Sequence, residues 1–252
     1  MKTHTTLVYA SLFCLGSAGC YTEVTSSTGE FGLLTYNFST DYEGGTEELT
    51  ELPLMTRVPH DIDVDLTERG SKRARGDGGL IEHTAGPAFV SQTGPSYDSD
   101  DPRSFEIVAG HAMQVAVESH LEGDLFDRIS LRFDDPSHLD VVTWIREPWE
   151  DDWRDRPHAN SLHVDEGAQI SFLAIPMAGD VRLGGDFTPQ ITVTPEHLVV
   201  PDEAVYAVQE EGMTTGGEAV TFYAIEPGVV TFTVSEPNHG IEVVRTVEIS
   251  GS

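Results

Sequence analysis

The sequence predicts an all-β protein built as two β-sandwiches in tandem, and three observations point to it. From Phe105 onward, strand signals recur about every 8 to 12 residues, the spacing of strands in a β-sandwich. Residues His60–Leu66 alternate strictly, with apolar residues on one face and aspartates on the other, as in a half-buried strand. Two series of strand signals follow in the same order, which indicates duplicated modules.

The first 19 residues have the order of a secretory signal. Lys2 gives a weakly basic start, residues 7–15 are mostly apolar, and small residues then lead to Cys20. The apolar segment is too short to span a bilayer, which takes roughly 20 residues. We therefore expect residues 1–19 to be a signal peptide and the protein to be exported.

Cys20 is the candidate for a lipid anchor. The run Ser17-Ala18-Gly19-Cys20 resembles the lipobox of bacterial lipoproteins. The resemblance implies that the Cys20 sulfur carries diacylglycerol, that the mature chain begins there, and that the protein is an outer-membrane lipoprotein. Ser17 stands where the lipobox has leucine, which leaves cleavage by the ordinary signal peptidase as the alternative. No other cysteine follows Cys20, so the mature chain cannot form an internal disulfide.

The chain is strongly acidic. It has 43 acidic and 14 basic residues among 252, with a formal net charge of −29. Such a charge excludes nucleic acid as an expected partner and suits an exported protein whose self-repulsion is screened by counterions. Lys72 is the only lysine after the signal segment.

We expect residues 20–30 to be the lipidated cysteine with a flexible tether, because they are small and polar. Residues 31–158 should form a β-sandwich module with long acidic loops. Its expected strands are residues 31–38, 60–66, 105–108, 113–119, 129–133 and 141–146. The predicted loops carry acidic clusters and one basic cluster at residues 69–75.

Residues 160–252 should form the second module. Its expected strands are residues 162–164, 170–175, 190–194, 205–208, 220–225, 229–235 and 241–249. Residues 220–234 form a strand, a Pro-Gly turn and an alternating strand. This motif resembles the closing half of a bacterial immunoglobulin-like (Ig-like) repeat of the invasin type. The resemblance covers about residues 162–249 well and 105–146 partly, and it implies an Ig-like β-sandwich without implying an activity.

The two modules can be aligned on short segments. Residues 105–110 match residues 162–167, and residues 136–139 match residues 195–198. We also expect Phe222, Ala224, Val230, Phe232 and Val234 to be buried, on two strands that the turn at residues 226–228 joins as an antiparallel pair. Tyr223, Thr231 and Thr233 should be more exposed.

A segment rich in tryptophan and acids follows residue 146. Pro148 and the acids after it predict a short helix over residues 148–157, with Trp149 and Trp153 on one face. Trp149 and Trp153 either pack onto a sheet or lie open as a sugar-stacking platform. Trp144 should be core in either case.

Candidate metal ligands are weak. Asp98, Asp100 and Asp101 are candidates for calcium, as are two other aspartate clusters at residues 61–65 and 134–140, but none has the spacing of an EF-hand. No zinc motif, nucleophile elbow, phosphate loop or dinucleotide fingerprint occurs in the sequence. We therefore expect no catalytic residues and no cofactor, with calcium as the one candidate.

Three functions are consistent with these features. The first is a non-enzymatic envelope lipoprotein whose Ig-like modules act as a spacer, assembly or adhesion module, with envelope proteins or polysaccharide as partners. The second is a carbohydrate-binding surface receptor that uses Trp149 and Trp153. The third is a hydrolase with an appended β domain.

Overall fold

A computed structural model describes residues 23–40, 48–74, 81–92, 104–150, 153–155, 160–185, 189–202, 209–210, 213–214 and 219–251. The chain divides into two compact units. The N-terminal module comprises Thr22–Pro136 together with Asp180–Asp186. The C-terminal module comprises Ser137–Gly179 and Phe187–Ser252. Within the described ranges, no helix is long and apolar enough to cross a membrane.

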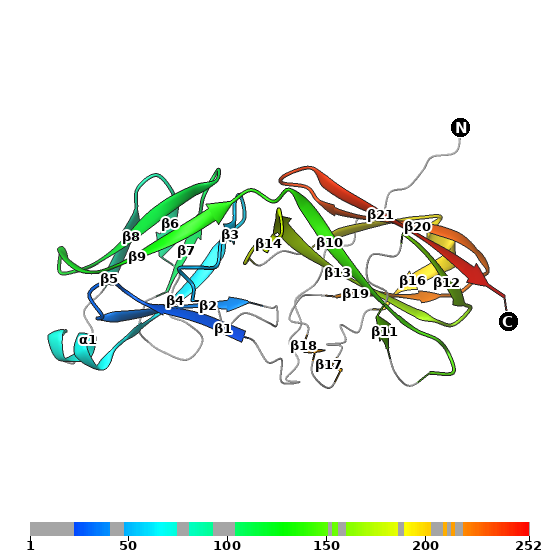
Figure 1. The fold of residues 1–252 in the computed structure, drawn as a ribbon, viewed down its shortest axis with the longest axis horizontal. Helices are drawn as coiled ribbons and strands as arrows, with labels where there is room; N and C mark the ends of the chain where they lie inside the picture. Colours follow the sequence, from blue (N-terminus) through cyan, green and yellow to red (C-terminus); the bar gives the residue numbers. More distant parts are fainter. Residues whose placement is uncertain are drawn as a thin grey trace. The chain divides into compact units, whose positions relative to one another are not determined.

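The N-terminal module is a sandwich of two sheets (Figure 1), with strand orders β1-β2-β4-β7-β6 and β3-β9-β8-β5. A helix, α1 (Glu68–Arg73), connects β4 to β5. The strands are β1 (Glu23–Thr28), β2 (Leu34–Thr40), β3 (Leu54–Met55), β4 (His60–Leu66), β5 (Ile81–Ala85), β6 (Phe89–Gln92), β7 (Phe105–Val108), β8 (Met113–Leu121) and β9 (Asp124–Asp134).

The C-terminal module is a second sandwich, with strand orders β11-β10-β13-β19-β16 and β12-β21-β20-β15. Its strands are β10 (His138–Arg146), β11 (Arg154–Asp155), β12 (Ser161–Asp165), β13 (Gln169–Ala178), β15 (Gln190–Thr194), β16 (Val199–Pro201), β19 (Val220–Ala224), β20 (Gly228–Glu236) and β21 (Ile241–Ser250). The remaining elements are β14 (Val181–Arg182), a 3₁₀ turn η1 (Glu196–Leu198), and a ribbon of β17 (Gln209–Glu210) and β18 (Met213–Thr214).

Both modules have the strand topology of an Ig-like sandwich, in which A, B, E and D form one sheet and C, F and G belong to the other. Strands A, A′, B, C, D, E, F and G are β2, β3, β4, β5, β6, β7, β8 and β9 in the N-terminal module. They are β10, β12, β13, β15, β16, β19, β20 and β21 in the C-terminal module. In each module A′ pairs in parallel with G. The predicted all-β, Ig-like fold is therefore confirmed.

The equivalence extends to single residues. Ala109 directly follows strand E of the N-terminal module and Ala224 is the last residue of strand E in the C-terminal module. The carbonyl of each accepts a hydrogen bond from the turn between A′ and B. The donors are the Arg57 amide at 2.8 Å and the Gly167 amide at 2.7 Å. Both donors have positive φ, 60° for Arg57 and 92° for Gly167. That backbone conformation is easy for glycine and uncommon for arginine.

This equivalence corrects the alignment proposed from the sequence. Residues 105–108 are strand E, and their counterpart is β19 at residues 220–224 rather than residues 162–164. Residues 138–139 begin strand A of the second module, whereas residues 196–198 are the 3₁₀ turn before strand D. The sequence match was misleading because short apolar strands look alike outside their sheet context.

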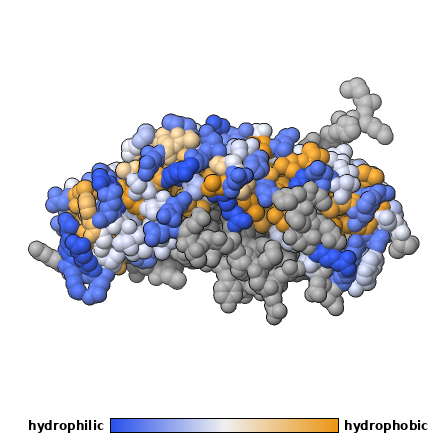
Figure 2. All heavy atoms as spheres, viewed as in Figure 1, coloured by the Kyte–Doolittle hydropathy of each residue, from blue (hydrophilic) through white to orange (hydrophobic). Residues whose placement is uncertain are grey.

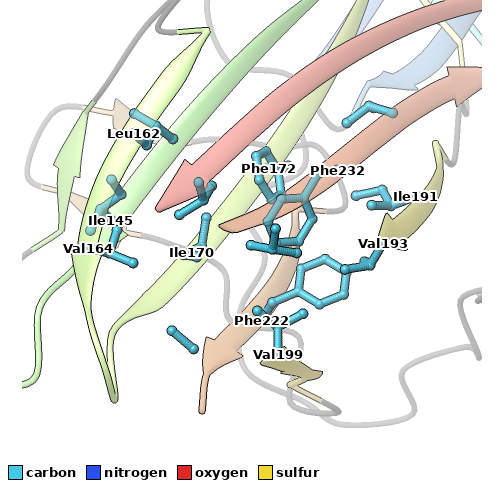
Figure 3. Close-up of a cluster of buried hydrophobic side chains, with 14 of the residues drawn as sticks. Ile145, Leu162, Val164, Ile170, Phe172, Ile191, Val193, Val199, Phe222 and Phe232 are labelled. Atoms are coloured by element: carbon cyan, nitrogen blue, oxygen red, sulfur yellow. The ribbon is translucent and has the colours of Figure 1, made fainter. Parts of the chain in front are cut away.

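The expected burial in the C-terminal module is confirmed. Phe222, Ala224, Val230, Phe232 and Val234 are all at most 1% exposed, whereas the three residues expected on the opposite face are more exposed. Figure 3 shows the side chains of Phe172, Phe222 and Phe232 gathered in this core, where Phe172 and Phe232 have ring centroids 4.7 Å apart. Trp144 is also buried, at 2% exposure.

The expected pairing of these strands is wrong. β19 pairs with β13 and β16, whereas β20 pairs with β15 and β21. The turn at residues 226–228 therefore crosses between the two sheets instead of closing a hairpin. Both arrangements bury the same alternate residues, because two facing sheets of a sandwich direct their inner side chains into one core.

The structure also differs from the expected module limits. Residues 23–28, expected to lie in a tether, form β1 and pair with all of residues 35–40. β-Branched residues in this small polar segment suit an extended strand. The modules divide after Pro136, because β10 pairs over nine residues with β13 of the C-terminal module. The first expected module thus contained a strand of the second.

The predicted helix over residues 148–157 is not present in its described part. Residues 148–149 form a turn, and Arg154 and Asp155 form β11, which pairs with Ile145 and Trp144. Backbone pairing along the edge of β10 outweighs the local helix preference in this segment.

Candidate functional site

The turn after β10 carries the most exposed tryptophan of the described residues. Trp149 is 67% exposed, whereas Trp153 is partly buried. The Arg146 guanidinium lies 5.2 Å from the centre of the Trp153 ring, a cation–π contact that covers one ring face. Only one of the two predicted platform rings is therefore open.

The turn is held in place by contacts to its own module. The Asp165 amide donates a hydrogen bond to Glu147 Oε2 at 3.1 Å. Pro148 packs against the turn at Gly167, where a Cβ would lie 3.2 Å from Pro148 Cγ. Glu150 and Arg154 form an ion pair that joins this turn to β11. Trp149 thus projects from a fixed turn.

The other predicted site residues divide into two groups. Cys20 and the calcium candidates Asp98, Asp100 and Asp101 lie outside the described residues. The aspartates of β4 are described, and they bind neighbouring polar groups: Asp63 accepts a hydrogen bond from Ser104 at 2.7 Å and Asp65 from Asn37 at 2.8 Å.

The third aspartate of β4, Asp61, has a raised pKa because of burial and the nearby carboxylates of Glu106 and Asp63. Mutual repulsion of this kind is what a cation would relieve. In the ranges that the structure covers, however, no group of three or more acidic, histidine or cysteine side chains is placed to hold a metal.

A serine, a histidine and a tyrosine meet in the N-terminal module, and sequence reasoning missed them. Ser119 Oγ lies 2.9 Å from His83 Nδ1 and 2.7 Å from the Tyr36 hydroxyl. Burial raises the pKa of Tyr36. Ser119 is 0% exposed and the His83 ring packs on Phe105, with centroids 4.6 Å apart. The three side chains come from strands A, C and F, so they join the two sheets within the core, where no substrate has access.

A buried carboxylate fixes the β1–β2 turn of the same module. Asp127 is 0% exposed and accepts the backbone N–H groups of Phe31, Leu33 and Leu34 at 2.8 Å each. Gly29 is required beside it, since a Cβ there would lie 2.5 Å from the carboxylate. In the sequence Asp127 is one of three polar residues between Leu125 and Leu131, so the pattern did not single it out.

A buried arginine on strand G of the C-terminal module, at the place of Ile129 in the N-terminal module, also binds the backbone at strand A. Arg245 of strand G is 7% exposed, and its guanidinium donates to the Val141 carbonyl of strand A at 3.3 Å and to Asn160 Oδ1 at 3.2 Å. Burial lowers its pKa. In both modules, therefore, a buried charged side chain of strand G binds the backbone at strand A.

His60 is a fully buried histidine of the N-terminal module. It is 0% exposed, lies between the rings of Phe38 and Phe133, and makes a 2.6 Å hydrogen bond from Nε2 to the Met55 carbonyl. Its Nδ1 atom makes no hydrogen bond to any residue that the structure describes. Burial lowers the pKa of His60 from 6.5 to about 4, so the ring is neutral at pH 7.

No known family model matches this chain, and no curated protein matches its sequence. Solved structures are similar to it at low identity. A C-terminal fragment of intimin, in complex with the translocated intimin receptor, is 11% identical, with a TM-score of 0.27, 75% of this chain covered and 57% of that one.

Two other solved structures are similar to this chain. Domains 4 and 5 of the S-layer protein SbsC are 12% identical, with a TM-score of 0.30 and coverage of 89% and 98%. The Escherichia coli adhesin FdeC is 14% identical, with a TM-score of 0.29 and coverage of 95% and 67%. Similarities at this level carry no argument about function, and the Ig-like assignment rests on the strand pairing described above.

Proposed function

We propose that this protein is a non-enzymatic envelope lipoprotein whose two Ig-like modules act as a spacer, assembly or adhesion module. The observation that carries the proposal is how the polar groups of the interior are used. The Ser119 cluster, Asp127 and Arg245 bind other core side chains or the backbone of their own module, where they stabilise the fold. Since these described interior groups serve the fold, we assign the function to the outer surface of the two sandwiches.

The proposed anchor is Cys20, supported by the signal-like segment before it and by the lack of another cysteine after it. Expression of the full chain in a bacterial host should place it in the membrane fraction, with incorporation of a labelled fatty acid. Cys20→Ser should release the protein into the soluble fraction. Equal membrane partitioning of the two forms would contradict the anchor.

The adhesion role is tested with beads coated with the purified chain. Such beads should bind intact cells or envelope fractions above the level of beads coated with an unrelated protein of similar charge. Binding equal to that control would contradict adhesion and leave the spacer and assembly roles.

A second candidate function is carbohydrate binding through the tryptophan turn, and the exposure of Trp149 favours it. An open indole ring on a fixed turn can stack on the apolar face of a sugar. Trp149→Ala should weaken binding to a responsive polysaccharide on a glycan array. Trp153→Ala should weaken it less, since Arg146 covers that ring. An unchanged array profile for Trp149→Ala would eliminate this candidate.

A further inference from the structure

One pole of the N-terminal module lies opposite the points where the chain enters and leaves this module. β1 pairs antiparallel with β2, with Glu23 beside Thr40 and Thr28 beside Thr35. The chain therefore enters the module beside Thr40, the last residue of β2. It then runs along β1 to the β1–β2 turn at the other end of β2. Without β1, the chain would enter the module at that turn.

The chain also leaves at the pole where it enters. The first part of β9 contacts the β1–β2 turn through Asp127, whereas Asp134 at its other end accepts a hydrogen bond from the Thr56 amide. Strand β4 runs between the same two ends, because Leu66 lies beside Leu34 and Ile62 beside Phe38. Entry and exit are thus at one pole. We name the opposite one the α1 pole; it comprises the β1–β2 turn, α1 and the β8–β9 turn (Figure 1).

The α1 pole carries an exposed group of basic side chains. Arg69, Lys72 and Arg73 all lie on α1 and are exposed. Their spacing of three and four residues places them on one helical face, about 5 to 6 Å apart. Lys72 pairs with Glu68 at 2.5 Å. Among the described residues, no carboxylate forms an ion pair with Arg69 or Arg73.

This basic group is held rigidly. Thr67 caps α1 by accepting the Gly70 amide, and its hydroxyl donates to the Gly32 carbonyl at 2.8 Å. Gly70 lies against the Leu33 carbonyl so closely that no side chain fits there. The Arg73 guanidinium stacks 5.4 Å from the centre of the Phe126 ring. The patch is therefore fixed on the turn that Asp127 holds.

An exposed aromatic residue lies in the β1–β2 turn, next in sequence to the glycine that Arg69 approaches. Phe31 is 38% exposed, and it precedes Gly32, where a Cβ would lie 3.8 Å from Arg69 Nη1. Hydrophilic residues predominate on the part of the N-terminal module where α1 lies (Figure 2). Acidic side chains are also present there, including Glu122 and Asp124 of the β8–β9 turn. The patch is thus small and local.

We propose that the α1 pole binds an acidic polysaccharide, with Arg69 and Arg73 pairing with its carboxylate groups and Phe31 stacking on a sugar face. A guanidinium matches a carboxylate in a bidentate arrangement, and an aromatic ring suits the apolar face of a sugar. A net charge of −29 repels polyanions in general. β9 has 11 residues, so the two poles are about 35 Å apart, several times the screening length of about 8 Å at physiological salt. A local positive patch can therefore act at this pole.

The inference rests on the proposed adhesion role and names its site and partner class. The test measures binding of the purified chain to immobilised alginate, a polyuronate, at 50 and 200 mM NaCl. The double variant Arg69→Gln/Arg73→Gln should lose at least tenfold in affinity at the lower salt and show a weaker salt dependence. Arg132→Gln is the control: it removes one positive charge, half of what the double variant removes, from a β9 residue paired with Asp134, and it should lose less than twofold.

Phe31→Ala separates a glycan from other polyanions. It should weaken binding to alginate severalfold and leave binding to polyglutamate unchanged. Equal losses for the double variant and Arg132→Gln would overturn the site, and polyglutamate binding as tight as alginate binding would overturn the assignment to a polysaccharide. Absence of alginate binding while coated beads still adhere to cells would refute this inference alone and leave the proposed function standing.

Discussion

The variant His60→Ile should remove a large part of the acid sensitivity of the N-terminal module. Isoleucine is the natural choice, because Ile170 has the equivalent place in the second module, three residues after the positive-φ position. In the native protein the His60 ring lies neutral between two phenylalanines, and burial holds its pKa at about 4. In the unfolded chain the pKa returns to 6.5.

The sign follows from the two pKa values. Between pH 6.5 and pH 4 the unfolded state binds a proton that the native state does not bind, so acid favours unfolding. The stability that the neutral His60 ring contributes is fully present above pH 6.5. This contribution declines as the pH falls toward 4, and below pH 4 it declines no further. With 1.36 kcal/mol per pKa unit, His60 should cost the module about 2.5 kcal/mol between pH 7.5 and pH 4.5.

The assay is urea unfolding of the full chain at the two pH values, followed by far-UV circular dichroism. All three tryptophans lie in the C-terminal module, so their fluorescence reports that module and not this one. The difference in unfolding free energy between wild type and His60→Ile should change by about 2.5 kcal/mol from pH 7.5 to pH 4.5. The exposed His111 gives the control: His111→Gln should leave that difference constant. A constant difference for His60→Ile as well would refute the reasoning from burial.

Two further predictions concern the cores. Asp127→Ala removes the acceptor of four backbone N–H groups, those of Phe31, Leu33, Leu34 and Arg128. It should lower the unfolding free energy of the N-terminal module by about 3 to 5 kcal/mol in urea, measured by circular dichroism; a loss below about 1 kcal/mol would show that the turn does not need the carboxylate. Phe232→Ala should destabilise the C-terminal module by about 3 to 5 kcal/mol and Thr233→Ala by less than about 1, measured by tryptophan fluorescence. Equal losses at residues 232 and 233 would contradict the observed register.

Strands with one buried face could be predicted well from the sequence. The bounds expected for His60–Leu66 and Phe105–Val108 match β4 and β7, because alternation records which side chains face the core. Short edge strands such as β1, β5 and β6 were missed, because a strand of four to six residues offers few apolar positions in alternation. The 148–157 segment shows the opposite failure, where a good local helix signal yields to pairing with β10.

Connections and buried polar groups were beyond the reach of periodicity. A hairpin and a crossing between sheets bury the same residues, so the turn at 226–228 could not be assigned from alternation alone. The hydrogen bonds of the buried side chains of Asp127 and Ser119 join them to Leu33 and Tyr36, residues distant in the sequence. Trp149 was found from composition, whereas its exposure depends on how Pro148 and Glu147 fix the turn.

The division of the chain after Pro136 is the central structural claim, and two fragments test it most directly. Strand β10 contributes Leu139, Val141 and Ile145 to the core of the C-terminal module, and each is at most 4% exposed. A fragment of residues 137–252 should therefore unfold in one cooperative thermal transition, measured by circular dichroism. A fragment of residues 160–252 should lack such a transition. A cooperative transition of equal midpoint in both fragments would contradict the account.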